Sequence, residues 1–292
     1  MDEFYVTLPS NVKGVKENTI GNFTTYLPSE LVLDYDWKVA VTEIFYTNSW
    51  FNLKKNNFVA INERNNDGGG HLLPIPGYGV TIMAGRYESL DELLSLINDY
   101  FLNNDGYEER QDGLTKDLPN HPKHEKPYLS HDRYTRLVTQ SIHTIQGTRR
   151  YMETEFQEEL GQLLGMEKGR EFSNAKFSSW YNFGNADKSM AQQLYAKRCY
   201  DMSGGIHSLY VYSDVVDYSH VGDTKCQLLR VVEIPSNSRY GDHVHITYQT
   251  PYYLPLANRN ISSIEIDIKD DSGEPIDFKF GRVEVVLHFK KE

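Results

Sequence analysis

The sequence "SIEIDIKDDSGEPIDFKFGRVEVVLHFKKE", Ser263–Glu292, alternates apolar and polar side chains on both sides of a turn at Asp270–Gly273. A period of two residues places the apolar side chains on one face of a β-strand. Asp, Ser and Gly in succession are typical of a tight turn between strands. We therefore predict a closing β-hairpin with one buried face.

Segments with the same pattern occupy both ends of the chain. Three early ones and five late ones, counting the two arms of the predicted hairpin, carry β-branched and aromatic residues: Glu3–Ser10, Asn22–Leu33, Trp37–Thr47, Gly205–Val216, Lys225–Ile234 and Asp242–Leu256 precede the hairpin. In the third of them, Trp37, Val39, Val41 and Phe45 are expected on one face. Eight antiparallel strands in two sheets make a jelly roll, so we predict a mainly β protein with this fold.

The middle of the chain predicts an α+β insertion between the third and fourth strands. In "TIMAGRYESLDELLSLINDYF" a short strand leads into a helix, with Ser89 as N-cap and Glu92 as its capping-box partner. The helix has an apolar stripe of Leu90, Leu93, Leu94, Ile97 and Phe101.

Further along the chain, two short strands (134–142 and 149–156) and a short helix closing at Gly165 are expected, followed by a helical turn or two in "AQQLYAKR". The glycine run Asp67–Gly79 is interpreted as a flexible loop between strands. The predicted domain limits are 1–80 and 201–292 for the jelly roll and 81–200 for the insertion with its connection.

Composition excludes several classes of partner. The chain of 292 residues has 30 Lys and Arg against 41 Asp and Glu, and the net charge of −11 argues against direct binding of nucleic acid. No segment has the roughly 20 apolar residues of a membrane span, and the acidic N-terminus does not resemble a signal peptide. Two cysteines, Cys199 and Cys226, are expected to be free thiols in a reducing compartment.

The histidine motifs of the sequence are incomplete as metal sites. His243 and His245 would face the same side of a strand, as in a metal-binding cupin, but Ile246–Thr250 contains no carboxylate to complete the site. His121, His124 and His131 lie around Pro122 and Pro127, which prevent a helix from presenting them together, although this loop is a candidate for sensitivity to acid.

Nucleophilic and phosphate-binding chemistry also lack their motifs. There is no Gly-x-Ser-x-Gly elbow, and the glycine run lacks the Gly-Lys-Ser/Thr ending of a phosphate loop. The segment "DIKDDSGEP" lacks the layout of a calcium loop. We therefore expect no catalytic residue, no cofactor and no metal, and predict that the protein is not an enzyme.

Several segments, taken in order, carry a family resemblance. They are "FYVTLPSN", "NTIGNFTTYLPSELVLDYDWKVAVTEIFYTNSWFN", "RYESLDELLSLIN", "ELGQLLGM", "LYVYSDVVDYSHVGDTKCQLLRVVEI" and "PYYLPLANRNISSIEIDIKDDSGEPIDFKFGRVEVVLHFKK". The series resembles the minor capsid, or penton, proteins of Polinton (Maverick) elements and their virophage relatives. Residues of about 103–130 and 167–200 carry no part of the resemblance.

The resemblance implies a structural role in a virion. Its members have a single jelly roll with an inserted domain, and five copies form a capsomer at each fivefold vertex of an icosahedral shell. Double jelly-roll major capsid proteins flank that capsomer. The implied location is the capsid vertex, with assembly in the host cytoplasm or nucleus.

Aromatic residues predict where subunits of such a ring would meet. Interfaces are enriched in Tyr, Trp and Phe, and candidate contacts lie in "WYNF" and "YYLPL": Trp180, Tyr181, Phe183, Tyr252 and Tyr253. The alternative is that these side chains pack within the monomer. A cupin-like or lectin-like jelly-roll binding protein is the alternative function.

Overall fold

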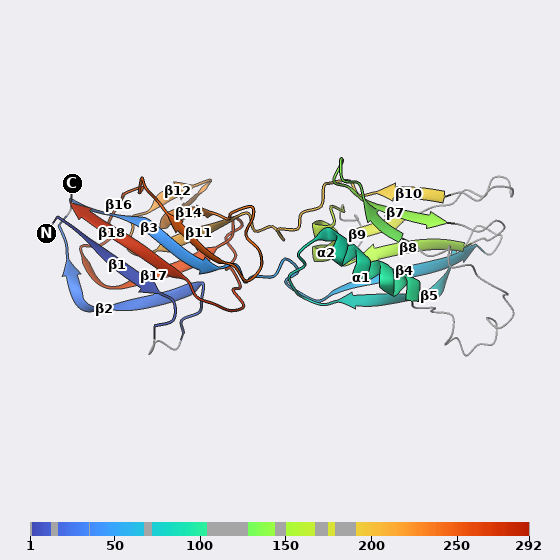
Figure 1. Ribbon diagram of the computed structural model, residues 1–292, viewed down its shortest axis with the longest axis horizontal. Coiled ribbons are helices and arrows are strands. Elements are labelled where there is room, and N and C mark those ends of the chain that lie inside the picture. Colours follow the sequence, from blue (N-terminus) through green and yellow to red (C-terminus); the bar gives the residue numbers. More distant parts are fainter. Residues whose placement is uncertain are drawn as a thin grey trace. The chain divides into compact units, whose positions relative to one another are not determined.

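The computed structural model describes residues 2–12, 17–34, 36–66, 72–103, 128–143, 150–166, 175–178 and 191–291. The chain divides into two compact units (Figure 1). One unit, the jelly-roll body, consists of Met1–Phe51 together with Gly205–Glu292, and the other, the insertion, is Asn52–Gly204.

Two antiparallel sheets form the jelly-roll body. Its strands are β1 (Glu3–Pro9), β2 (Asn22–Val32), β3 (Trp37–Thr47), β11 (Ser208–Ser213), β12 (Ser219–Val221), β13 (Thr224–Cys226), β14 (Leu228–Glu233), β15 (His243–Thr247), β16 (Leu254–Pro255), β17 (Asn260–Lys269) and β18 (Glu284–Lys291). One sheet has the order β1-β18-β3-β15, with β16 also paired to β3, and the other has the order β14-β11-β17-β2. Strands β12 and β13 form a separate hairpin.

The strand order is that of a jelly roll. Numbering the eight long strands along the chain gives 1-8-3-6 in one sheet and 5-4-7-2 in the other. Figure 1 shows the last strand, β18 in red, lying between the early strands β1 and β3 in blue. The predicted interleaving of the two ends of the chain is confirmed.

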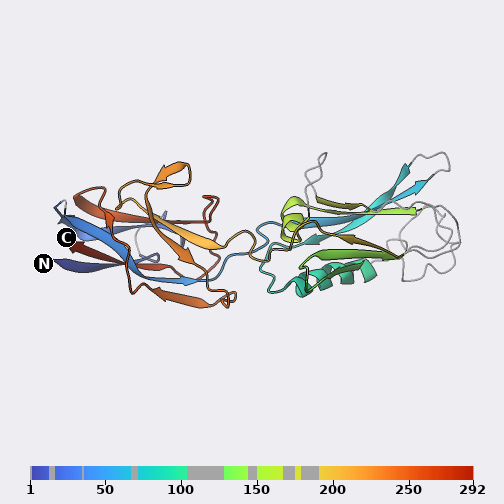
Figure 2. The ribbon, with the colours of Figure 1, turned by 90° about the horizontal axis from the view of Figure 1, so that it is seen from above.

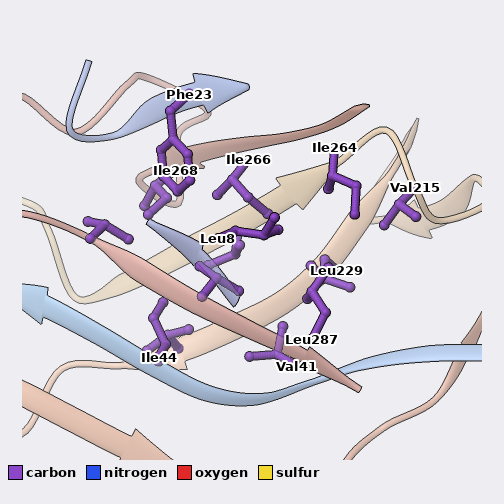
Figure 3. Close-up of a cluster of buried hydrophobic side chains, with 14 of the residues drawn as sticks. Leu8, Phe23, Val41, Ile44, Val215, Leu229, Ile264, Ile266, Ile268 and Leu287 are labelled. Atoms are coloured by element: carbon purple, nitrogen blue, oxygen red, sulfur yellow. The ribbon is translucent and has the colours of Figure 1, made fainter. Parts of the chain in front are cut away.

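The core of the body lies between the two sheets. Leu8, Ile44 and Leu287 from one sheet point toward Phe23 and Ile266 from the other (Figure 3), and all five are fully buried. Burying one such side chain contributes roughly 1.5–3 kcal/mol relative to leaving it in water. The alternation read in the sequence therefore marks the inner faces of both sheets.

The predicted closing hairpin is wrong in one respect: its arms do not pair with each other. β17 pairs with β11 and β2, whereas β18 pairs with β1 and β3 in the opposite sheet. The expected turn is present, because Asp270 Oδ1 accepts hydrogen bonds from the backbone N–H of Ser272 (3.0 Å) and Glu274 (2.9 Å). The chain then follows β17 back only to Ile276, whose N–H donates to Ile268 O at 3.1 Å, before it crosses to the other sheet. Each arm has a single apolar face. The two faces can pack against each other only when the arms lie in opposite sheets.

The predicted buried face of β3 is wrong for the residues beyond a β-bulge. The register with β18 shifts between Val286 and Leu287, so that Thr42 on β3 has no directly opposed partner. Beyond this point Ile44 and Tyr46 face the core, with 0% and 2% exposure. Phe45, expected on the buried face, lies on the outer face.

The insertion contains two sheets and two helices within the described residues. Its elements are β4 (Asn57–Asn66), β5 (Leu72–Ile82), α1 (Leu90–Asn103), β6 (Tyr128–His131), β7 (Val138–His143), β8 (Arg150–Phe156), α2 (Glu158–Leu163), β9 (Ala175–Ser178) and β10 (Ala191–Tyr195). The sheet orders are β5-β4-β8-β9 and β10-β7-β6. Figure 2 shows α1 along one side of these strands, and a separate core includes Val59, Leu93, Ile97 and Phe156.

Two of the predicted helices, α1 and α2, are confirmed, with a variation in the capping box of α1. Glu92 N–H donates to Ser89 Oγ at 3.2 Å, while the Glu92 carboxylate accepts from Glu88 N–H at 2.9 Å, one residue before the cap. Four predicted stripe residues, Leu90, Leu93, Leu94 and Ile97, are buried; the side chain of Phe101 lies outside the described residues. Neither helix of the described part of the chain is long and apolar enough to cross a membrane.

Two local predictions in the insertion are wrong. Ala191–Tyr195, expected to be helical, is strand β10 and pairs with β7. Leu72–Ile82, which includes the end of the glycine run, is strand β5 and pairs with β4. In both places backbone pairing with another strand outweighs local residue preference: the partner of β10 is distant in the sequence, whereas the partner of β5 is the other arm of a hairpin.

The limits of the units differ from the predicted ones. The insertion begins at Asn52, and not at 81, because β4 and β5 form a hairpin whose β4 edge pairs with β8. It ends at Gly204, close to the expected 200, and comprises more than half of the chain, so it is not small.

Candidate subunit-contact surface

The predicted contact residues divide into two groups. Trp180, Tyr181 and Phe183 lie outside the described residues. Tyr252 and Tyr253 lie in the segment that leads into β16, on the jelly-roll body. Only the second group can therefore be placed.

The two adjacent tyrosines have different environments. Tyr252 has 66% of its surface exposed. Tyr253 is partly buried, and its hydroxyl lies 2.7 Å from Nδ1 of His288 on β18. Burial, together with the negative charges that Tyr5 and Glu3 can carry, raises the pKa of Tyr253, so the phenol is protonated at neutral pH and can donate this hydrogen bond. Tyr253 thus packs within the monomer, while Tyr252 is available for contact.

His288 is the centre of an aromatic stack on the outer face of its sheet. It pairs with Tyr5 of β1 in register, and the two rings are stacked at 4.3 Å with 8° between their planes. His288 is only 6% exposed, because Tyr5 and Tyr253 contact its ring, whereas Tyr5 is 62% exposed. Its Nε2 lies 3.4 Å from a Glu3 carboxylate oxygen, within ion-pair distance but outside hydrogen-bond geometry.

A second stack lies farther along the same face, on β3 and β15. The Phe45 and His245 rings are 3.9 Å apart with 9° between their planes. His245 Nε2 lies 2.8 Å from Glu43 Oε2, and His243 Nδ1 lies 3.0 Å from Thr47 Oγ1. We call the outer surface formed by Tyr5, Phe45, His245, Tyr252, Tyr253 and His288 the tyrosine–histidine face.

Glu43 supplies a carboxylate beside His245 that the sequence around the two histidines, His243 and His245, does not contain. The segment after these histidines supplies no carboxylate, but β3 supplies one beside His245 through strand pairing. Glu43 and His245 are 202 positions apart, so no local motif could have revealed the pair. Among the described residues, no group of three or more His, Cys, Asp or Glu side chains is arranged to hold a metal ion.

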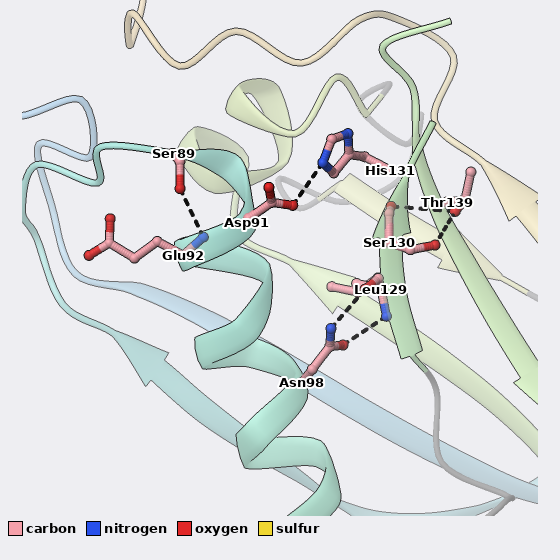
Figure 4. Close-up of polar contacts among 8 residues, drawn as sticks. All are labelled: Ser89, Asp91, Glu92, Asn98, Leu129, Ser130, His131 and Thr139. Carbon is pink, nitrogen blue, oxygen red and sulfur yellow. Dashed lines mark hydrogen bonds and ion pairs between the residues drawn. The ribbon is translucent and has the colours of Figure 1, made fainter. Parts of the chain in front are cut away.

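Of the loop histidines, only His131 lies in the described residues, where it joins β6 to α1 (Figure 4). Its Nε2 is 2.8 Å from Asp91 Oδ1 in the first turn of the helix. Farther along, Asn98 Nδ2 donates to Leu129 O at 2.7 Å, and Leu129 N–H donates to Asn98 Oδ1 at 2.8 Å. These contacts attach the strand to the helix and provide no catalytic arrangement.

The jelly-roll body combines both ends of the chain in its two sheets, and the insertion lies between its third and fourth strands. The same fold is found in a penton protein of known structure.

The crystal structure of the mavirus penton protein superposes with a TM-score of 0.50 at 11% sequence identity, covering 100% of this chain and 99% of that one. A chain in the cryo-EM structure of the Sputnik virophage gives a TM-score of 0.49 at 11% identity, with 100% and 98% covered. No protein-family model and no curated protein matches the sequence.

Proposed function

We propose that this chain is a penton, or minor capsid, protein of a virophage or Polinton (Maverick) element. Five copies would form the capsomer at each fivefold vertex of an icosahedral capsid. The observation that carries the proposal is the correspondence with the fold of the mavirus penton protein along nearly the whole of both chains, insertion included. The function is structural and non-enzymatic.

The partners follow from the geometry of a vertex. A ring of five copies uses a heterologous interface, in which one edge of a subunit meets the opposite edge of its neighbour. Around that ring the protein would contact double jelly-roll major capsid proteins. The net charge of −11 is consistent with contact to protein and not to packaged DNA.

The tyrosine–histidine face is the proposed contact between subunits. Tyr5 and Tyr252 are exposed aromatic side chains beside a buried aromatic stack, and exposed tyrosines with a rigid base are favourable interface anchors. Trp180, Tyr181 and Phe183 stay additional candidates. The insertion is proposed to be a domain that folds by itself and projects from the outer surface of the shell.

Light scattering of the purified full chain tests the assembly. A pentamer would have five times the 33.8 kDa mass of the chain, either alone or after addition of the major capsid protein. A particle labelled against the chain should carry label only at its vertices in electron micrographs. A monomer with one tightly bound zinc or iron ion would favour a cupin-like protein instead.

A double variant tests the proposed face. Replacing Tyr5 and Tyr252 by Ala should weaken association on the order of 30-fold, the effect of losing about 2 kcal/mol at a central contact. Tyr134→Ala in the insertion, where the side chain is 98% exposed, is the matched control and should leave association unchanged. Equal association of all three proteins would exclude this face.

A further inference from the structure

A cleft of about 780 Å³ lies on the outer face of the second sheet of the jelly-roll body. Its floor is formed by β11 and β17, and one wall is formed by the β12–β13 hairpin. The volume falls within the roughly 300–1,000 Å³ of sites that bind small ligands. Neither strand pairing nor the hydrophobic core accounts for an open polar cleft here.

The floor presents a tyrosine flanked by charged groups of both signs. Lys269 Nζ lies 3.0 Å from Asp267 Oδ2 and 5.5 Å from the centre of the Tyr212 ring. Burial is the main cause of the raised pKa of Tyr212, so its hydroxyl is a neutral donor and acceptor at physiological pH. The floor therefore combines an apolar ring with hydrogen-bonding groups.

The wall presents a second, more exposed tyrosine. Tyr218 has 56% of its surface exposed, and Lys225 Nζ lies 5.8 Å from its ring centre. Thr224 adds a hydroxyl from the same hairpin. The two tyrosines thus lie on two different sides of the cleft, each with a lysine ammonium group beside it.

Hydrogen bonds fix two further polar side chains of the lining, Asp214 and Gln227. Asp214 Oδ1 accepts the backbone N–H of Glu265 at 2.9 Å, and burial raises the pKa of the Asp214 carboxyl. Gln227 Nε2 donates to Val216 O at 2.8 Å and to Asp214 O at 3.3 Å. These bonds fix the two side chains, which reduces the conformational entropy that a ligand would have to remove.

The charges of the lining restrict the ligand. Five carboxyl side chains and two ammonium groups line the cleft: Asp214, Asp223, Glu265, Asp267, Asp271, Lys225 and Lys269. The excess of negative charge repels phosphorylated, sulphated and sialylated molecules. A cationic peptide would meet a lysine at each tyrosine ring, where its own charged group would otherwise stack.

We infer that this cleft binds a neutral oligosaccharide. The C–H faces of a sugar ring contact Tyr212 and Tyr218, while its hydroxyl groups, each both donor and acceptor, reach the carboxylates, the lysines and Gln227. A mixed lining of donors and acceptors around aromatic rings suits a molecule with many hydroxyl groups and no net charge. The site belongs to the jelly-roll body alone and does not depend on the proposed assembly.

A glycan array tests this inference. The full chain is applied to an array that carries neutral hexose, fucose and N-acetylhexosamine oligosaccharides beside sialylated and sulphated ones. The best-bound neutral glycan is then titrated calorimetrically against the parent chain, Tyr218→Ala and Tyr26→Ala. Tyr26 is a matched control, because it is 67% exposed on β2 of the same sheet and does not line the cleft.

The expected result is saturable binding of neutral glycans that Tyr218→Ala weakens about tenfold and Tyr26→Ala leaves unchanged. Absence of neutral-glycan binding, a preference for anionic glycans, or equal affinity of Tyr218→Ala would overturn the inference. Binding of an arginine- and lysine-rich peptide with no glycan binding would do the same. Oligomeric mass is measured on the same samples, so failure here is distinguishable from failure of the vertex proposal.

Discussion

The Asn52 side chain links the beginning and the end of the insertion through hydrogen bonds. Its removal tests this link directly. Asn52 is 1% exposed. Its Nδ2 donates to Tyr87 O at 2.9 Å and to Met202 O at 3.0 Å, and its Oδ1 accepts Tyr87 N–H at 3.0 Å. Gly204, with φ of +67°, passes so close that an added Cβ would lie 2.6 Å from Asn52 O. One amide thus connects the first residue of the insertion to its last turn.

Asn52→Ala leaves three backbone groups without this partner: the buried N–H and O of Tyr87 and the partly buried O of Met202. Each buried group left unsatisfied costs roughly 1–3 kcal/mol, and partial relaxation makes the sum less than additive. We expect the free energy of unfolding of the insertion to fall by about 3–5 kcal/mol. Asn56→Ala is the matched control, because within the described part of the chain Asn56 accepts one exposed hydrogen bond, from Ala84 N–H at 2.8 Å. Its loss should cost less than about 1 kcal/mol.

Hydrogen exchange read by mass spectrometry locates the loss. Peptides that cover α1 and β4 should lose protection in Asn52→Ala, whereas peptides from β17 and β18 should retain theirs if the insertion folds as a separate domain. If Asn52→Ala costs no more than Asn56→Ala, the Asn52 amide does not hold the two ends of the insertion together. Equal loss of protection in both units would instead reject independent folding.

Three further predictions concern the jelly-roll body. The bulge directs Ile44 inward and Phe45 outward. In a urea titration, Ile44→Ala should therefore lower the free energy of unfolding by about 2–5 kcal/mol, and Phe45→Ala by clearly less. The opposite order of the two variants would disprove the register. Tyr46 is 2% exposed and its hydroxyl has no hydrogen-bond partner in the described residues, so Tyr46→Phe should be neutral or stabilising by up to about 1 kcal/mol. Burial also raises the pKa of Tyr46 and Tyr248, so stability should be fully present below the unfolded pKa of about 10 and fall as pH rises beyond it. Above about pH 10 the free energy of unfolding should fall less steeply with pH for Tyr46→Phe than for the parent chain. An identical pH dependence of the two proteins would contradict this assignment.

Sequence patterns predicted those strands and helix ends that are set by residues close together in the chain. The alternation in Ser263–Lys269 directs Ile264, Ile266 and Ile268 into the core, as the period of two requires. The capping box at Ser89 and the positive φ of Gly165 likewise depend on neighbouring residues, and both helices are present in the structure. Of the candidate contacts, Tyr252 is exposed and Tyr253 is partly buried against His288, which the adjacent letters "YY" do not distinguish.

Side-chain alternation and turn chemistry act over a few residues, so the identity and inward face of most strands of the jelly-roll body could be predicted from local patterns. Long-range strand pairing places β17 and β18 in opposite sheets, turns Phe45 outward at a bulge, and makes β10 a strand. The tertiary structure also brings Glu43 beside His245 and Asn52 beside Met202. These outcomes depend on which distant strands supply backbone hydrogen bonds and on which layer covers an apolar face, and neither is encoded in any single stretch of residues.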